Sequence, residues 1–178
     1  MKSVICIMVV FSICCMTFAA PMSYDGITVE VESLVGTGGN QTMIVVDWET
    51  GLTQSHAWLY KYDGAKVVAD ALNAVQSSVA DFQWSQSAFV QYINYDEGSE
   101  YHHTINTGWL SFWNKGSEDW QWDNLGVYQQ QLLNGGWSGI IADDYPDWGD
   151  VPPTIPVPEP AAVLLFVVGA CIARRRRK

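Results

Sequence analysis

The sequence predicts an α+β fold class: a single β-rich domain, an antiparallel sheet with one clear helix, flanked by an N-terminal signal peptide and a short C-terminal transmembrane helix. Three observations lead to this prediction. Short runs of β-branched and aromatic residues recur between turn signals, one stretch has helical periodicity, and an apolar run lies near each end of the chain. We expect residues 20–145 to form the domain.

Three strands are predicted in the first half of this domain. Apolar and polar residues alternate over 27–31, which is typical of a half-buried strand. After the turn GTGGN, residues 41–48 form a nearly continuous β-branched run that suits a central strand. A second turn at ETG leads into residues 55–62, where alternation places four side chains on one strand face: His56, Trp58, Tyr60 and Tyr62.

The periodicity then changes to that of a helix. Residues 66–75 place five apolar side chains on one helical stripe: Val67, Val68, Ala71, Leu72 and Val75. Asp63 is the predicted N-cap, because an aspartate side chain accepts hydrogen bonds from the first backbone N–H groups of a helix. We expect the helix to end near Val79.

Strand signals return after the helix. The segment SAFVQYINY (87–95) predicts a strand, and EYHHTINT (100–107) predicts its hairpin partner across the turn DEGSE. Two aromatic-rich strands, GWLSFWNKG (108–116) and EDWQWDN (118–124), are expected next. The segment GVYQQQLLNGG (126–136) fits a helix or a strand, and residues 146–157 are expected to be a proline-rich, acidic linker.

The N-terminus has the layout of a secretory signal peptide. One positive charge at Lys2 precedes an apolar run and then small residues, and we expect cleavage after Ala19. The alternative is an uncleaved anchor, but the run is shorter than the ~20 apolar residues that a span requires.

Charge and cysteine are segregated to the two ends. Between Ala20 and Val157 there are eighteen acidic residues, three lysines and no arginine, so this segment has a net charge of about −15. A surface of that charge cannot grip phosphates, so we expect no nucleic-acid partner. All four cysteines lie in the two terminal apolar stretches, which leaves no thiol in the domain for catalysis, disulfides or zinc.

The C-terminus combines three features in order. Pro158, Glu159 and Pro160 are followed by an uncharged run over 161–173 and then by Arg174, Arg175, Arg176, Arg177 and Lys178. Thirteen helical residues cover about 20 Å, against a hydrocarbon core of about 30 Å. The basic side chains can extend along the apolar edge to reach water, and the positive-inside rule places them in the cytoplasm with the domain outside. A buried helix of a soluble protein is the alternative, but it leaves five consecutive cations unexplained.

This arrangement resembles the PEP-CTERM protein-sorting signal of bacteria, over residues 158–178. The resemblance implies recognition by an exosortase, a membrane-embedded cysteine transpeptidase, cleavage near Pro-Glu-Pro, and delivery to the cell surface or the exopolysaccharide matrix. The segments VVDWETG, HAWLYKYDG, GWLSFWN and NGGWSG also resemble a family of uncharacterised exported bacterial proteins, which implies no activity.

The domain offers one candidate binding chemistry and little support for catalysis. Nine tryptophans suggest an aromatic platform for carbohydrate, an alternative to a core-filling role, and the candidate contacts are Trp109, Trp120, Trp122 and Trp137. Acidic clusters near residues 96–100, 118–123 and 143–150 lack a calcium-loop pattern. Neighbouring His102 and His103 would point to opposite faces of a strand, so we expect no metal site and no cofactor. No nucleophile elbow or phosphate loop is present, and we predict that the protein is not an enzyme.

Overall fold

The computed structural model describes residues 20–48, 55–86, 90–96, 102–105, 109–143 and 151–157, and within these ranges it is β-rich with one helix. This confirms the predicted β-rich domain with a single helix. The elements are β1 (Ala20–Tyr24), β2 (Ile27–Val31), β3 (Ser33–Gly36), β4 (Asn40–Asp47), β5 (Ser55–Tyr62), α2 (Val68–Ser78), β6 (Phe82–Gln86), β7 (Val90–Asp96), β8 (His102–Ile105), β9 (Trp109–Lys115), β10 (Gln121–Asp123) and β11 (Trp137–Asp143).

The largest sheet has six strands in the order β10-β9-β11-β4-β5-β3. It is a mixed sheet, which corrects the prediction of a purely antiparallel one: β11 runs parallel to β4, and β3 runs parallel to β5. The cause lies in the connections. β4 and β5 are antiparallel neighbours, and β3 lies on the far side of β5 from β4. The chain crosses the end of β5 and reverses direction between β3 and β4, so β3 runs parallel to β5. The last strand, β11, inserts between β4 and β9.

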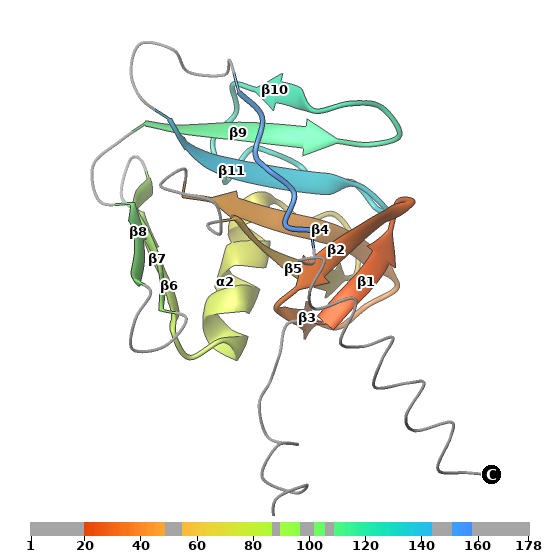
Figure 1. Cartoon of the computed structure of the whole chain (residues 1–178), viewed down its shortest axis with the longest axis horizontal. Helices are drawn as coiled ribbons and strands as arrows, with labels where there is room; N and C mark the ends of the chain where they lie inside the picture. The colour runs from red at the N-terminus through yellow and green to blue at the C-terminus, as the bar shows by residue number, and fades with distance from the viewer. Residues whose placement is uncertain are drawn as a thin grey trace, which may run out of the picture.

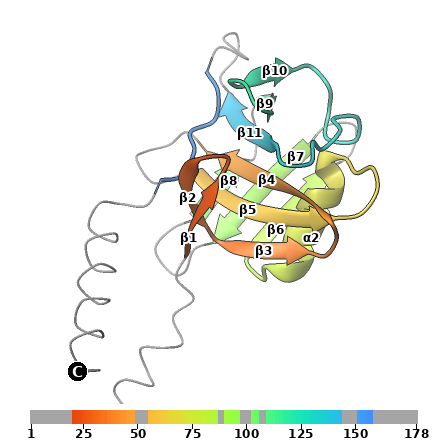
Figure 2. The same ribbon diagram turned by 90° about the vertical axis from the view of Figure 1, so that its right-hand side faces the viewer.

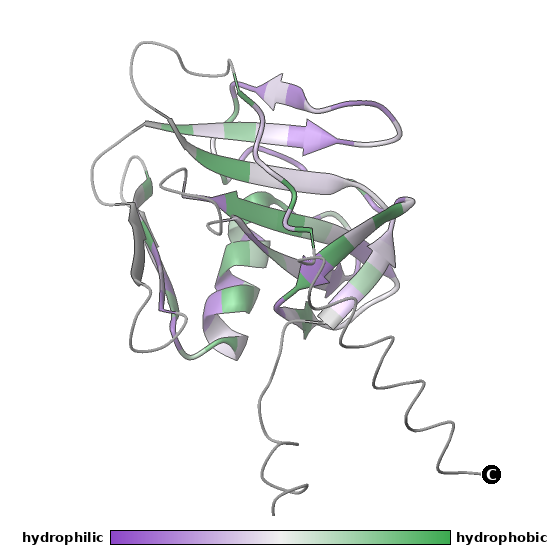
Figure 3. Ribbon diagram, in the orientation of Figure 1, coloured by the Kyte–Doolittle hydropathy of each residue, from purple (hydrophilic) through white to green (hydrophobic). Residues whose placement is uncertain are grey.

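Both faces of this sheet are covered, as Figures 1 and 2 show. The helix α2 and the three-stranded sheet β6-β7-β8 cover one face, where Ile44, Val46 and Trp58 are buried. The β1–β2 hairpin covers the other face, where Met43 and Val45 are buried. Burial on both sides explains why β4 has an almost continuous apolar sequence, which appears as a green band in Figure 3.

The β1–β2 hairpin extends the predicted first strand by a partner that was not predicted. Asp25 and Gly26 connect the strands with φ angles of 50° and 75°. Two consecutive left-handed residues form the tight turn whose twist matches that of antiparallel strands, and Asp-Gly is a favoured pair for it. The pair was therefore a usable sequence signal for β1.

The helix lies where it was predicted, and its first turn differs. Four of the five predicted stripe residues are buried in it, and the helix ends at Ser78 with Val79 as its C-cap, close to the predicted end. It begins only at Val68, so the prediction of Asp63 as N-cap is wrong. The Asp63 carboxylate instead accepts the backbone N–H of Gly39 at 2.9 Å. Asp70 Oδ2 accepts the Val67 N–H at 3.0 Å and closes the first turn.

The elements predicted after the helix are confirmed in part. β7 and β8 form the predicted hairpin, and β9 and β10 form the predicted aromatic-rich pair. β6 was not predicted. Residues 126–136 form neither a helix nor a strand, apart from one bridge between Gln131 and Val67, and they bury Val127, Gln130 and Leu132.

Several predicted features lie outside the described residues. These are the signal peptide over 1–19, the sorting motif Pro158–Pro160, the apolar run 161–173 and the basic residues 174–178. Among the residues that the structure describes, no helix has the length and apolar character needed to cross a bilayer.

Candidate functional site

The last described segment, residues 151–157, lies along the face of the six-stranded sheet opposite to α2, and we call it the strap. In Figure 1 it is the dark blue trace that crosses β11 and reaches β2. Its backbone is held at two places. The Thr154 N–H donates to Asp47 Oδ2 at 2.7 Å, and the Glu30 N–H of β2 donates to the Pro156 carbonyl at 2.9 Å. The Ser55 hydroxyl also donates to the Thr154 carbonyl.

Side-chain packing under the strap depends on Gly139 of β11. Pro153 is buried above this glycine, and Ile155 packs against the apolar cluster formed with the hairpin. A Cβ atom at position 139 would lie 2.3 Å from Pro153 Cγ and 3.0 Å from a ring carbon of Trp120. Glycine is therefore required here for the close approach of the strap to the sheet.

Both ends of the described body meet at the single strand β2. Ala20, at the start of β1, pairs with Val31 of β2. The Pro156 carbonyl accepts the backbone N–H of Glu30 on the same strand. The sequence predicts a linker over 146–157, whereas its described part packs on the body. Val157, which is 62 % exposed, is the last described residue and directly precedes the predicted sorting motif.

The four predicted carbohydrate contacts are placed in different environments. Trp137 is fully buried, which corrects its prediction as a contact, and its indole N–H donates to Asp25 Oδ2 at 3.3 Å. Trp120 is half-buried and meets Trp137 edge-on, with ring centroids 6.3 Å apart. Trp122 is 49 % exposed on the edge strand β10. The side chain of Trp109 lies outside the described residues.

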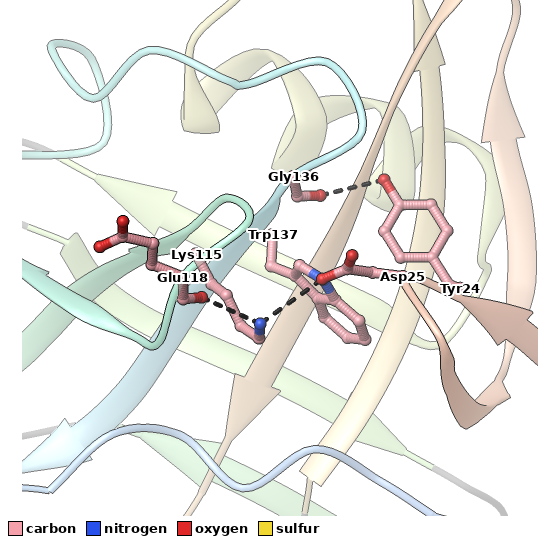
Figure 4. A network of polar contacts seen from close by, with 6 residues as sticks. All are labelled: Tyr24, Asp25, Lys115, Glu118, Gly136 and Trp137. Carbon is pink, nitrogen blue, oxygen red and sulfur yellow. Dashed lines mark hydrogen bonds and ion pairs between the residues drawn. The ribbon is translucent and has the colours of Figure 1, made fainter.

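Asp25 links the hairpin to the rest of the body, as Figure 4 shows. Besides Trp137, it meets Lys115 Nζ at 3.4 Å, and the same ammonium group donates to the Glu118 carbonyl at 3.0 Å. The adjacent Tyr24 hydroxyl donates to the Gly136 carbonyl at 3.0 Å. Burial, followed by the nearby Tyr62 and Asp25, raises the pKa of Tyr24 to about 12. This hydroxyl therefore remains protonated at neutral pH.

A buried histidine forms a second polar cluster, at the other end of the sheet. His56 Nδ1 lies 2.7 Å from Glu32 Oε1, and the Tyr95 hydroxyl donates to Glu32 Oε2 at 3.3 Å. The His56 ring also packs against Trp48 and Tyr95. A carboxylate on one ring nitrogen fixes the orientation of an imidazole. The cluster thereby joins β5, β7 and the segment between β2 and β3. Glu32 had no sequence signal, because it lies where the strand alternation breaks.

The described residues contain no group of three or more His, Cys, Asp or Glu side chains arranged to hold a metal ion. No protein-family model, curated protein or solved structure matches the chain.

Proposed function

We propose that this protein is an exported component of the bacterial cell surface or extracellular matrix, without enzymatic activity. The N-terminal signal directs its export. Residues 161–173 hold it transiently in the membrane with its basic end in the cytoplasm. An exosortase cuts it near Pro158-Glu159-Pro160.

The observation that carries this proposal is the order of the three C-terminal features in a chain whose residues 1–19 also have the layout of a signal peptide. A motif, an apolar run and a basic cluster, in that order at the chain end, have no role in a folded soluble body. The proline-rich approach to the motif supports the same interpretation, because proline disfavours helix and keeps the chain extended. Extended chain next to a membrane is what a processing enzyme can bind.

The strap supports the proposal, because in an anchored precursor it would keep the body close to the membrane before cleavage. Pro156 is bonded to β2, and Ala161 begins the apolar run five residues later. Even a fully extended chain spans at most ~3.6 Å per residue, so these two positions are separated by no more than about 18 Å. The anchored precursor would hold its body against the outer bilayer surface, and cleavage would free it.

The test is to express the full chain in an exosortase-containing bacterium and to determine its intact mass and location. We expect a mature form that begins at Ala20, has lost the apolar run and basic end, and is retained at the surface or matrix. A variant with Pro158, Glu159 and Pro160 replaced by alanine should keep the uncut C-terminus in the membrane fraction. A chain lacking residues 158–178 should be released into the medium.

Two results would contradict the proposal. One is a wild-type chain that keeps its full C-terminal mass in this host. The other is equal retention at the envelope with and without residues 158–178.

A further inference from the structure

We propose that the β9–β10 edge of the six-stranded sheet binds an amine-bearing hexosamine polymer, with Trp122 as the ring on which a sugar stacks. This site goes beyond the delivery route proposed above, and its test does not depend on processing of the tail.

The geometry begins with a row of indole side chains on one face of the sheet. Trp122 pairs directly with Trp113 across β10 and β9, and Trp113 pairs with Gly139 of β11, so all three positions share one face. Trp137 lies two residues before Gly139 on β11 and therefore has the same face. Exposure decreases sharply along the row, from 49 % at Trp122 to 6 % at Trp113 and none at Trp137. Trp113 and Trp137 are buried in the body, and the Trp122 ring is open to solvent on the last strand of the sheet.

The second observation is an unsatisfied donor in this row. The Nε1–H of Trp113 is buried and has no hydrogen-bond partner among the described residues. A buried donor without an acceptor destabilises the protein, and the destabilisation is removed when an acceptor arrives. Sugar hydroxyls are both donors and acceptors, so a sugar stacked on Trp122 that reaches this N–H from the edge would supply the missing partner.

The charge around Trp122 selects the kind of sugar. Glu118 and Asp119 are exposed in the turn that enters β10. Asp123, the residue after Trp122, points to the other face of the strand, where its carboxylate accepts from the Asn114 side-chain amide and the Leu125 N–H. The nearby ammonium of Lys115 is already engaged by Asp25 and the Glu118 carbonyl. Uronate, sulfate or phosphate groups would be repelled here. A protonated amine is attracted by the carboxylates and by the face of an indole.

The experiment is a calorimetric titration of the full chain in detergent with a glucosamine hexamer and with the N-acetylglucosamine hexamer of the same length. These two ligands share the sugar ring and differ in the amine charge. We expect the free-amine hexamer to bind at least tenfold more tightly than the acetylated one. Trp122→Ala should weaken its binding about tenfold or more, and Trp122→Phe should restore part of the loss.

Tyr128→Ala is the matched control. Tyr128 is an aromatic residue of similar exposure, 57 %, and it lies near Trp84 on the opposite side of the sheet. Its removal should leave the affinity unchanged. Equal binding of the two hexamers would overturn the charge argument, as would preferential binding of an alginate oligomer. No binding of the free-amine hexamer, or equal losses in the Trp122 and Tyr128 variants, would overturn the site itself.

Discussion

Replacing Gly139 by alanine tests whether the strap is a structural part of the body. The new methyl group would lie 2.3 Å from Pro153 Cγ, well inside van der Waals contact, with Trp120 ring carbons at 3.0 and 3.1 Å. Neither neighbour can yield easily, because the proline ring is stiff and buried and Trp120 is wedged against Trp137. The strap itself must therefore move away from β11.

The expected cost follows from this geometry. Overpacking a well-packed site by one methyl group destabilises a protein by about 1–3 kcal/mol. Release of the strap limits the cost from above, since a detached strap removes the clash. We expect a loss of about 2 kcal/mol in the free energy of unfolding.

Urea unfolding would measure that loss, and amide hydrogen exchange would locate it. The Thr154 and Glu30 N–H groups hold the strap, so both should exchange faster, by about 30-fold for 2 kcal/mol. Gly116→Ala is the control, because a Cβ atom at that position meets nothing within 4 Å. If Gly139→Ala matched the control within about 0.5 kcal/mol and left both amides protected, the packing argument would be refuted.

Three further predictions address the polar contacts. Asp47→Ala removes the acceptor of the Thr154 N–H. We expect hydrogen exchange of that amide to accelerate at least tenfold, because a hydrogen bond to a charged group contributes about 1.5–3 kcal/mol. Unchanged exchange would show that this bond does not hold the strap. His56→Ala leaves the Glu32 carboxylate with the Tyr95 hydroxyl but without its ring partner. Urea unfolding should show a loss of about 2–4 kcal/mol in the free energy of unfolding, from the lost ring packing and the lost bond to the acid. A loss below about 1 kcal/mol would contradict a joining role for the cluster. Tyr24 has a pKa of about 12 in the folded protein against an ordinary 10.0, so its contribution to stability is complete below pH 10 and is lost as the pH rises through 12. Tyr24→Phe should therefore flatten the fall of stability measured by alkaline denaturation, and an identical pH profile in both proteins would refute this.

Local patterns were sufficient to predict most of the elements. The β-branched run of β4 and the apolar stripe of α2 carry their signals within about ten residues. β1 and β6 were missed for different reasons. β1 adjoins the apolar stretch that we interpret as a signal peptide, which obscures its start. β6 directly follows the helix, where Phe82 and Trp84 contribute only two inward positions. The parallel pairing of β4 with β11 joins residues more than ninety positions apart, and no local pattern records that.

The candidate sites were predictable to different extents. The alternation of apolar and polar residues correctly predicts that Trp122 lies on a strand. It does not indicate which face of that strand is covered by another element. Trp137 and Trp122 therefore looked equivalent in the sequence, although one is in the core and the other at an edge. The strap was expected to belong to a linker because residues 146–157 are rich in proline and acidic side chains. What fixes it in place is the fit of Pro153 over Gly139, which exists only after β11 has joined the sheet.

The way the strap is attached also determines how the body responds to mechanical force. A pull on the chain beyond Val157 reaches the Pro156–Glu30 hydrogen bond first and the Thr154–Asp47 hydrogen bond next, because the two lie one after the other along the chain. Hydrogen bonds loaded in series break one at a time and at low force, whereas the hydrogen bonds between strands that are pulled along their length share the load. In the proposed membrane-anchored precursor, movement of the membrane would therefore detach the strap first. The six-stranded sheet would bear no load until the strap has detached.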